Sequence, residues 1–423
     1  MTRRLAAALL CGILAWGPGC GDEPVEEHSP LSPHRWQPAP AAAPGSQADA
    51  EAGLLRAIGY LPGYEPGERG GGVTAHDPER AWPGVNLYTS GHAAVANLLD
   101  MEGRPLHTWQ LDFRAAFPDT DETALQAAGT QFWRRVALLD DGGLIAIFDY
   151  HGVVRIDRES RLVWARQGRY HHDLWLGDGK LWVLRVESSA AGALPGRSGS
   201  VFEEQLVLLD ADDGQELRHV SLLEAFRRSR YAELLGRLPN IEDVFHDNTI
   251  EILPAPGREP VFAPGRALVS LRNIHTIAVV DLATERVEWA TTGPWRMQHE
   301  PRLLPSGRLL LFNNLGVPEL SRVLEFEPFT QRIDWSYGGL PEQAFQSEGM
   351  GSVQRLPNGS TLVTDSFSGR AFEVTPTGQV VWRFDNPART GEDGAYVAVV
   401  PELWRIPEGR AAAWLPEESS HER

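Results

Sequence analysis

The sequence predicts an all-β protein, a six-bladed β-propeller that is closed by an N-terminal strand and carries a short helical insertion. Three observations predict this fold. The chain repeats itself every roughly 45 to 75 residues, a spacing that is typical of propeller blades and other arrays. Each unit contains a proline or glycine turn followed by a β-type run, and most units end in a strand with a tryptophan. Four short strands per unit correspond to one blade.

The repeated turn has the sequence Leu-Pro-x-Gly or a relative of it. It occurs at residues 139–142, 176–179, 304–307, 356–359 and 406–409, with an expanded version at Leu253 and Pro254. Proline and glycine supply the backbone angles of tight turns, and a β-type run such as residues 308–312 follows each turn. We therefore expect each turn to join the first two strands of a blade.

The tryptophan strand is the second repeated feature. It covers residues 157–164, 281–289, 327–335, 375–382 and 100–109, whereas segment 210–219 keeps the acidic turn and lacks the tryptophan. A large aromatic ring at a repeated strand position usually fills a core. A structural role is therefore expected for Trp164, Trp289, Trp335 and Trp382.

The number of blades follows from the units. Complete units cover residues 133–166, 170–222, 246–292, 299–337 and 350–384, and a last unit at Pro407 is cut short by the C-terminus. The strand at residues 100–109 would complete it, which removes open sheet edges. Five or seven blades remain alternatives because the second unit carries insertions. One of these, residues 222–238, has helical spacing.

The net charge of −18 argues against a nucleic acid or an anionic membrane as partner. Hydrophobic content of 42% and charged content of 23% are ordinary for a soluble globular protein. A local cluster of arginine and histidine can still bind an anionic substrate.

The N-terminal residues predict export. Arg3 and Arg4 precede an apolar run, residues 5–16, that is too short to span a bilayer. Cys20 follows small residues, as in a bacterial lipoprotein cleavage site, so we expect a lipid anchor there; an ordinary signal peptide is the alternative. Residues 1–20 would be the signal, 21–53 a Pro/Ala-rich tether, 54–415 the propeller and 416–423 a polar tail. The predicted location is the periplasm or cell envelope, with membrane contact only through the anchor.

Several polar residues fall where neighbouring blades begin. The start of the first strand and the end of the second strand of a blade lie at the same mouth of the channel. The candidates at these places are His171 and His172, His246, Arg272, and His299. His171 and His299 are equally far from the glycines of their turns, Gly179 and Gly307, so His171 is in register, but a β-bulge would favour His172 instead.

These residue types indicate a transferable anion. Three histidines could bind a metal, but a nearby arginine would repel a cation. Imidazole can act as a nucleophile, while guanidinium and imidazolium can stabilise charge on the oxygens of a tetrahedral group.

The segments around these residues resemble the bacterial arylsulfate sulfotransferase family. They are residues 245–250 (Phe-His-Asp-Asn-Thr-Ile), 270–273 (Ser-Leu-Arg-Asn), 298–301 (Gln-His-Glu-Pro) and 312–314 (Phe-Asn-Asn). The resemblance extends over about residues 54–415 and implies a six-bladed propeller. The chain departs from better-known members because it has a tether in place of an N-terminal β domain, and no cysteine pair for a disulfide.

The resemblance also implies a reaction. A sulfuryl group would move from a phenolic sulfate ester to a phenolic acceptor in a ping-pong mechanism that uses neither PAPS nor another cofactor or metal. His299 would be the sulfated nucleophile. His246, Arg272 and either His171 or His172 would bind the sulfuryl oxygens, with one histidine handling the phenol proton.

Two other classes of function remain open. A non-catalytic propeller of the cell envelope could bind a ligand or a protein partner on its rim. A quinone- or metal-dependent propeller enzyme fits less well, because the chain lacks calcium-type Asp clusters. The sequence makes no prediction of the oligomeric state.

Overall fold

The computed structural model describes residues 63–66, 70–121, 125, 127–190, 194, 200–239, 241–253, 259–317 and 320–415. The predicted signal peptide, Cys20, the tether and the polar tail lie outside these residues.

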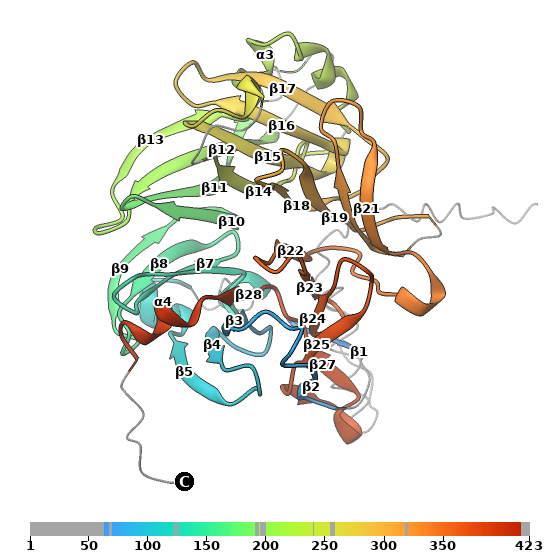
Figure 1. The fold of residues 1–423 in the computed structure, drawn as a ribbon. Helices are drawn as coiled ribbons and strands as arrows, with labels where there is room; N and C mark the ends of the chain where they lie inside the picture. The colour runs from blue at the N-terminus through green and yellow to red at the C-terminus, as the bar shows by residue number, and fades with distance from the viewer. Residues whose placement is uncertain are drawn as a thin grey trace, which may run out of the picture.

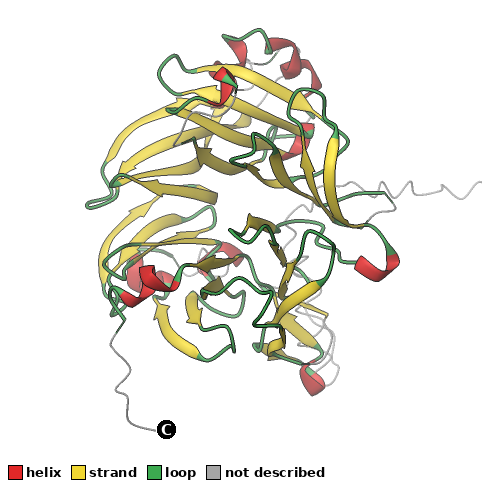
Figure 2. Cartoon of the chain, in the orientation of Figure 1, coloured by secondary structure: helices red, strands yellow, loops and turns green. Residues whose placement is uncertain are grey.

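The described residues form antiparallel sheets arranged around a common centre, in the manner of a β-propeller (Figure 1). Strands dominate, and the helices are short and peripheral (Figure 2). Six sheets have four or five strands.

Sheet 1 contains β6 (Arg135–Leu138), β7 (Leu144–Phe148), β8 (Gly152–Ile156) and β9 (Leu162–Gln167). Sheet 2 contains β10 (Tyr170–Gly177), β11 (Lys180–Ala190), β12 (Ser200–Asp210) and β13 (Glu216–Ser221). Sheet 3 contains β14 (Asp247–Ile252), β15 (Arg266–Leu271), β16 (Thr276–Asp281) and β17 (Arg286–Thr292).

The remaining sheets continue around the centre. Sheet 4 contains β18 (His299–Leu303), β19 (Leu309–Asn313), β20 (Arg322–Phe326) and β21 (Ile333–Gly338). Sheet 5 contains β22 (Ser352–Arg355), β23 (Thr361–Asp365), β24 (Arg370–Val374) and β25 (Val380–Asp385), with β2 (Gly72–His76) outside β25. Sheet 6 contains β28 (Leu403–Ile406), β3 (Val85–Thr89), β4 (Val95–Leu99) and β5 (Pro105–Gln110). A small sheet is formed by β1 (Tyr64–Pro66), β27 (Tyr396–Ala398) and β26 (Arg389–Thr390).

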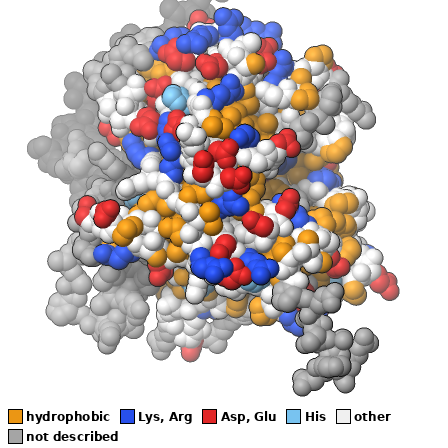
Figure 3. Space-filling model, turned by 90° about the vertical axis from the view of Figure 1, so that its left-hand side faces the viewer, with side chains coloured by type: hydrophobic (Ala, Val, Ile, Leu, Met, Phe, Trp, Pro, Cys, Tyr) orange, Lys and Arg blue, Asp and Glu red, His pale blue; other side chains and the backbone are white. Residues whose placement is uncertain are grey.

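Burial explains the sequences of the strands. The second strands β7, β19 and β23 are buried along their whole length, and β7 and β19 read as nearly continuous apolar runs, as expected where both faces of a sheet are covered. The outer strand β9 is mostly exposed. Its side of the molecule carries interspersed acidic and basic side chains (Figure 3), including the ion pair of Arg161 with Asp157 at 2.8 Å.

The inner strands contact one another in the order β6, β10, β14, β18, β22 and β28. Side chains then join the last sheet to the first. Arg135 at the start of β6 forms an ion pair with Glu402, just before β28, and Arg134 Nη1 lies 3.5 Å from the carbonyl of Pro401.

Sheet 6 combines both ends of the described chain. The C-terminal β28 pairs with β3, and β5 is the outer strand, so the tryptophan strand at residues 100–109 shares a sheet with the last strand as predicted. One expectation is wrong. The turn at Pro407 is followed by helix α4 (Glu408–Ala412) rather than a strand, because β3 already occupies the edge beside β28.

The other helices are short. The predicted helical segment at residues 222–238 contains α3 (Leu222–Arg227) and the 3₁₀ helix η4 (Ala232–Arg237). Ser221 caps α3, because its Oγ accepts a hydrogen bond from Glu224 N at 3.1 Å. The others are α2 (Phe113–Ala116), η2 (Ala128–Thr130), η5 (Pro260–Phe262), η6 (Arg272–Ile274), η7 (Pro341–Gln343) and η8 (Glu392–Gly394). Within the described ranges, no helix has the length and apolar character needed to cross a membrane.

The tryptophans of the outer strands join neighbouring sheets. Trp109 Nε1 donates to the carbonyl of Gly142 at 2.9 Å, and Trp164, Trp335 and Trp382 donate to carbonyls of the adjoining sheets at 2.9 to 3.1 Å. Trp289 packs between Phe262 and Phe329 instead. The predicted structural role of this repeated residue is confirmed.

Candidate functional site

The predicted site residues lie at equivalent ends of neighbouring sheets. His171 and His172 are the second and third residues of β10, His246 immediately precedes β14, and His299 begins β18. Arg272 begins η6, directly after β15. His172 and His246 are in direct contact, with their Nε2 atoms 3.1 Å apart, and the charges of Arg272 and His246 lower the pKa of His299.

A β-bulge decides how the two adjacent histidines are oriented. The register of β10 shifts between His171 and Leu174, and His172 adopts a left-handed backbone conformation with φ of 54°. The bulge leaves the two rings in contact but at 87° to each other, so that they face different partners. His172 Nε2 lies 3.1 Å from His246 Nε2, whereas His171 is fully buried and stacks on Tyr150 with a centroid separation of 4.9 Å.

The three rings form a chain between two carboxyl groups. His246 Nδ1 bonds to Asp243 Oδ2, and its Nε2 meets His172 Nε2 at 3.1 Å. His172 Nδ1 meets His171 Nδ1 at 2.9 Å, and His171 Nε2 lies 2.9 Å from Glu204 Oε2. The contacts of His246 with Asp243, of His246 with His172 and of His172 with His171 are hydrogen bonds that each need one proton. The contact of His171 with Glu204 is close but lacks hydrogen-bond geometry.

The ends of this chain have opposite protonation tendencies. Burial would raise the pKa of Asp243, but the charges of His246 and Arg272 lower it to about 2. Burial raises the pKa of Glu204 well above its usual value. The surroundings therefore favour the ionised form of Asp243 at one end of the chain and the neutral form of Glu204 at the other.

The imidazoles themselves are neutral. Burial lowers the pKa of His171 to about 4, and burial with repulsion from His246 and His171 lowers that of His172 well below its usual value. Burial and the charge of Arg272 also lower the pKa of His246, although Asp243 limits this shift. With Asp243 accepting from His246 Nδ1, His246 Nε2 carries a lone pair.

His299 is held in one tautomer. Its Nδ1 lies 2.8 Å from Asn314 Oδ1 and 3.0 Å from the carbonyl of Met297. The amide of Asn314 is itself fixed, because its Nδ2 donates to the carbonyls of Ser347 and Met350 at 2.7 and 2.6 Å. Two oxygens facing Nδ1 require that Nδ1 carry the proton, so the lone pair of His299 is on Nε2.

The electrostatic surroundings keep His299 uncharged. Burial and the charge of Arg134 lower the pKa of His299 to about 3; Arg272 and His246 add to this effect, and the bond with Asn314 opposes it. A neutral imidazole with a bare Nε2 beside cationic groups can attack an electrophile that carries negative charge.

The start of β18, where His299 lies, is held by hydrogen bonds to sheet 3. Gln298 is fully buried, and its Nε2 lies 3.1 Å from Ser270 Oγ and 3.2 Å from the carbonyl of Thr276. Asn248 Nδ2 donates to the carbonyl of Gln298 at 2.8 Å. Sheet 3 thus holds the backbone on either side of the histidine.

A buried ion-pair cluster lies next to the histidines along the inner strands. Arg135 is within 2.6 Å of both Asp173 and Glu300, and it also pairs with Glu402. Arg302 pairs with Glu300 as well. The cluster joins sheets 1, 2 and 4 to the segment before β28.

Sequence reasoning missed three members of the site. Asp243 and Arg134 precede their strands, in segments with no repeated pattern, and Glu204 lies within β12, away from the expected mouth. Asp243 and Arg134 are polar residues that lie shortly before a predicted first strand, and this position was the available signal for them. No group of three or more His, Cys, Asp or Glu in the described part of the chain has the geometry to hold a metal ion.

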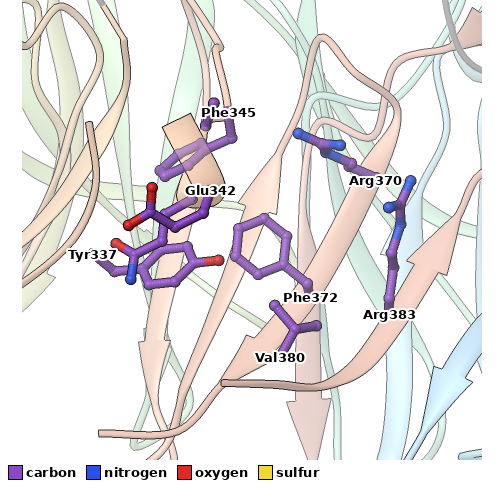
Figure 4. Close-up of a pocket in the computed structure, with 9 residues that line it drawn as sticks. Tyr337, Glu342, Phe345, Arg370, Phe372, Val380 and Arg383 are labelled. Carbon is purple, nitrogen blue, oxygen red and sulfur yellow. The ribbon is translucent and has the colours of Figure 1, made fainter. Parts of the chain in front are cut away.

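A cavity of about 220 Å³ lies elsewhere, between sheets 4 and 5, and contains none of these residues (Figure 4). Its arginines already have carboxylate partners. Arg370 Nε bonds to Asp365 at 2.9 Å, and Arg383 Nη2 bonds to Asp385 at 2.8 Å.

Fold and site together define a β-propeller with a buried cluster of histidine and arginine at one mouth. The chain belongs to the arylsulfotransferase (ASST) family, whose model matches residues 135–387. This range includes every predicted catalytic residue. Membership suggests arylsulfotransferase activity on small phenolic substrates.

Other comparisons are more distant. No curated protein matches the chain. A Bacteroides caccae protein of unknown function is similar in structure, with 12% identity, a TM-score of 0.49, and coverage of 76% of this chain and 98% of its own. The β-propeller domain of Myceliophteria thermophila Cps50 (Swd1) has 9% identity, a TM-score of 0.44, and coverage of 81% and 99%, respectively.

Proposed function

We propose that the protein is a PAPS-independent aryl-sulfate sulfotransferase, which moves a sulfuryl group from a phenolic sulfate ester to a phenolic acceptor through a sulfohistidine at His299. The observation that carries the proposal is the fixed tautomer of His299. Asn314 and the Met297 carbonyl hold the Nδ1 proton, so the Nε2 lone pair is available, and the low pKa keeps it available at neutral pH.

The first half-reaction follows from these groups. The Nε2 lone pair of His299 forms a bond to sulfur while the bond from sulfur to the phenolic oxygen breaks, and its electron pair leaves on that oxygen. Arg272 would stabilise the sulfuryl oxygens. In the second half-reaction, the oxygen of an acceptor phenol attacks sulfur and restores His299.

His246 would handle the phenol proton in both steps. Its Nε2 can accept the proton of an acceptor phenol that displaces His172, and the carboxylate of Asp243 would balance the imidazolium. The same proton can return to the departing phenolate of the next donor. His172 would complete the pocket, while His171, fully buried, would support it.

The setting of this site is part of the proposal. We take the six sheets as six blades of a ring that the contacts of Arg135 with Glu402 close. The N-terminal segment would carry a signal peptide, a lipid anchor at Cys20 and a tether, so that the enzyme works in the periplasm or cell envelope.

The test is incubation of the purified protein with 4-nitrophenyl sulfate, with and without phenol and without PAPS. We expect phenol-dependent release of nitrophenol, and loss of this activity in His299→Ala. His219→Ala, on the outer strand β13, is the matched control and should retain activity. With donor alone, the peptide that contains His299 should gain the mass of one SO₃ group. No turnover over a wide range of donors and acceptors, together with no sulfated His299, would contradict the proposal.

A further inference from the structure

Arg134 is a buried arginine without a carboxylate partner. It lies directly before β6 and is 5% exposed. Within the described residues its Nε has no hydrogen-bond partner, and its Nη1 has only the carbonyl of Pro401, at a long 3.5 Å. The adjacent Arg135, by contrast, is paired with Asp173, Glu300 and Glu402.

This arrangement is costly for a folded protein. A guanidinium is always charged at accessible pH, and a buried charge without a counter-ion is strongly unfavourable. The neighbouring carboxylates Asp173, Glu300 and Glu402 pair with Arg135 instead. A buried guanidinium that is left without a carboxylate is the kind of group that binds an anionic ligand.

The position of Arg134 in the fold is opposite that of His299. Arg134 lies directly before β6 and His299 begins β18, and the inner strands β10 and β14 lie between them in the order of neighbours around the centre, whereas Arg272 comes from the neighbouring sheet 3. In agreement with a position near the histidines, the charge of Arg134 lowers the pKa of His299 more than any other single charged group does, and it also lowers the pKa of His172 and His171.

We propose that Arg134 is a second guanidinium of the active site, and that it binds the oxygens of the transferring sulfuryl group from the side facing His299. This inference rests on the proposed function and extends it. The sulfuryl group carries a negative charge on three oxygens before, during and after the transfer. Arg134 supplies no proton; it stabilises this charge while the bond from sulfur to the phenolic oxygen breaks and the bond to His299 Nε2 forms.

The first experiment measures anion binding without turnover. Inorganic sulfate should raise the melting temperature of the wild-type protein, because a ligand that binds only the folded state stabilises it. In Arg134→Met this rise should largely disappear, while in Arg161→Met, a control whose side chain is exposed to solvent, it should remain. Without sulfate, Arg134→Met should melt no lower than the wild type, because a methionine removes an uncompensated buried charge.

The second experiment measures catalysis. Arg134→Met should lower kcat/KM for 4-nitrophenyl sulfate by about 10²- to 10³-fold, the usual effect of losing one oxyanion donor. The acid limb of the pH profile should also move to higher pH, because His299 loses a neighbouring positive charge. Arg134→Lys should restore the position of the limb but only part of kcat/KM, since lysine cannot bind bidentately. It also serves as the folded variant if the methionine variant does not fold.

The two proposals fail in different ways. If Arg134→Met keeps both the sulfate-dependent stabilisation and wild-type kcat/KM, the role of Arg134 is wrong and the sulfotransferase remains. If sulfate binding depends on Arg134 but no aryl sulfate is turned over, the anion site stands and the proposed function is wrong.

Discussion

Asp243 lies at the outer end of the imidazole chain, and its carboxylate accepts a hydrogen bond from His246 Nδ1. Without this carboxylate, either nitrogen of His246 could carry the proton. With it, the lone pair is fixed on Nε2, and an imidazolium formed there is stabilised by a neighbouring negative charge. Asp243 is thus a positioning residue for the proposed acid and base.

Asp243→Asn should slow the transfer from poor donors more than from good ones. A phenyl sulfate with a basic leaving group needs a proton as the bond breaks, so kcat/KM should fall by about 10²-fold. For 4-nitrophenyl sulfate the fall should be several times smaller, because nitrophenolate leaves unprotonated. Kinetics over a series of phenyl sulfates measure this difference, with exposed Glu242→Gln as control. An equal loss for all donors would show that Asp243 only maintains the fold.

The site illustrates what register can predict for single residues. Counting from the turns predicted that His299 and His246 lie at strand starts, where the structure has them, and Arg272 follows the end of β15. The choice between His171 and His172 depended on a bulge, which changes orientation without changing the sequence spacing. Asp243 and Arg134 precede strands in segments without periodicity, and their proximity to the histidines arises only from the packing of separate sheets.

Among the elements, sheet 6 depends on one buried arginine. Arg405 on β28 donates to Asn86 on β3 at 2.6 Å, to Glu373 on β24 at 2.8 Å, and to the carbonyl of Trp82 at 2.7 Å. Arg405 and Glu373 are both inaccessible to solvent. One side chain therefore fixes β28 to its own sheet and to sheet 5.

Arg405→Met should lower the free energy of unfolding by about 3 to 5 kcal/mol, because it leaves the buried Glu373 without a counter-charge, although Trp82 N and Asn358 Nδ2 still donate to its carboxylate. The double variant Arg405→Met/Glu373→Gln should recover a large part of this loss. Chemical denaturation of both variants measures the difference. If the double variant is less stable than the single one, the buried charge of Glu373 is not the cause of the lost stability.

The same elements show how far the repeat could predict the fold. The predicted units at residues 133–166, 170–222, 246–292, 299–337 and 350–384 coincide closely with sheets 1 to 5. The strand that follows each turn was predictable because turn chemistry is local. At Pro407 this prediction failed, because the edge of β28 that a following strand would pair with is occupied by β3, which lies more than three hundred residues earlier in the chain. The extra strand β2, outside β25, is another long-range pairing that no local pattern reveals.

For the whole molecule, buried titratable groups set opposing pH dependences. His299 and His171 have pKa values of about 3 and about 4, below those of an unfolded histidine, so they destabilise the folded state progressively as the pH falls below about 6.5. Burial raises the pKa of Glu402 to about 8 and that of Glu251 to about 7. These two carboxyls bind protons more tightly when folded, so their contribution is lost as the pH rises above about 4.3.

The melting temperature should therefore have a maximum between about pH 4.3 and 6.5, and should decline from pH 6.5 to 8. Below about pH 4.3 the histidine effect is no longer opposed by Glu402 and Glu251, and Asp243, whose pKa is lowered to about 2, adds to the loss, so stability should fall again. Glu402→Gln, which keeps an oxygen for Arg135, should flatten the alkaline side of the curve. Calorimetry across this range tests the prediction, and a stability that rises steadily to pH 8 would contradict it.

The pairing of β28 with β3 has a consequence for biogenesis. Leu403 is opposite Tyr88 in the ladder, so this contact can form only after nearly the whole propeller has been synthesised. Contacts between such distant parts of a chain are slow to form. Pro401 and Glu402, which contact Arg134 and Arg135, arrive with that last strand. A chain that stalls before this step would expose an unpaired edge to chaperones and proteases, and would lack the backbone that positions its anion-binding arginine.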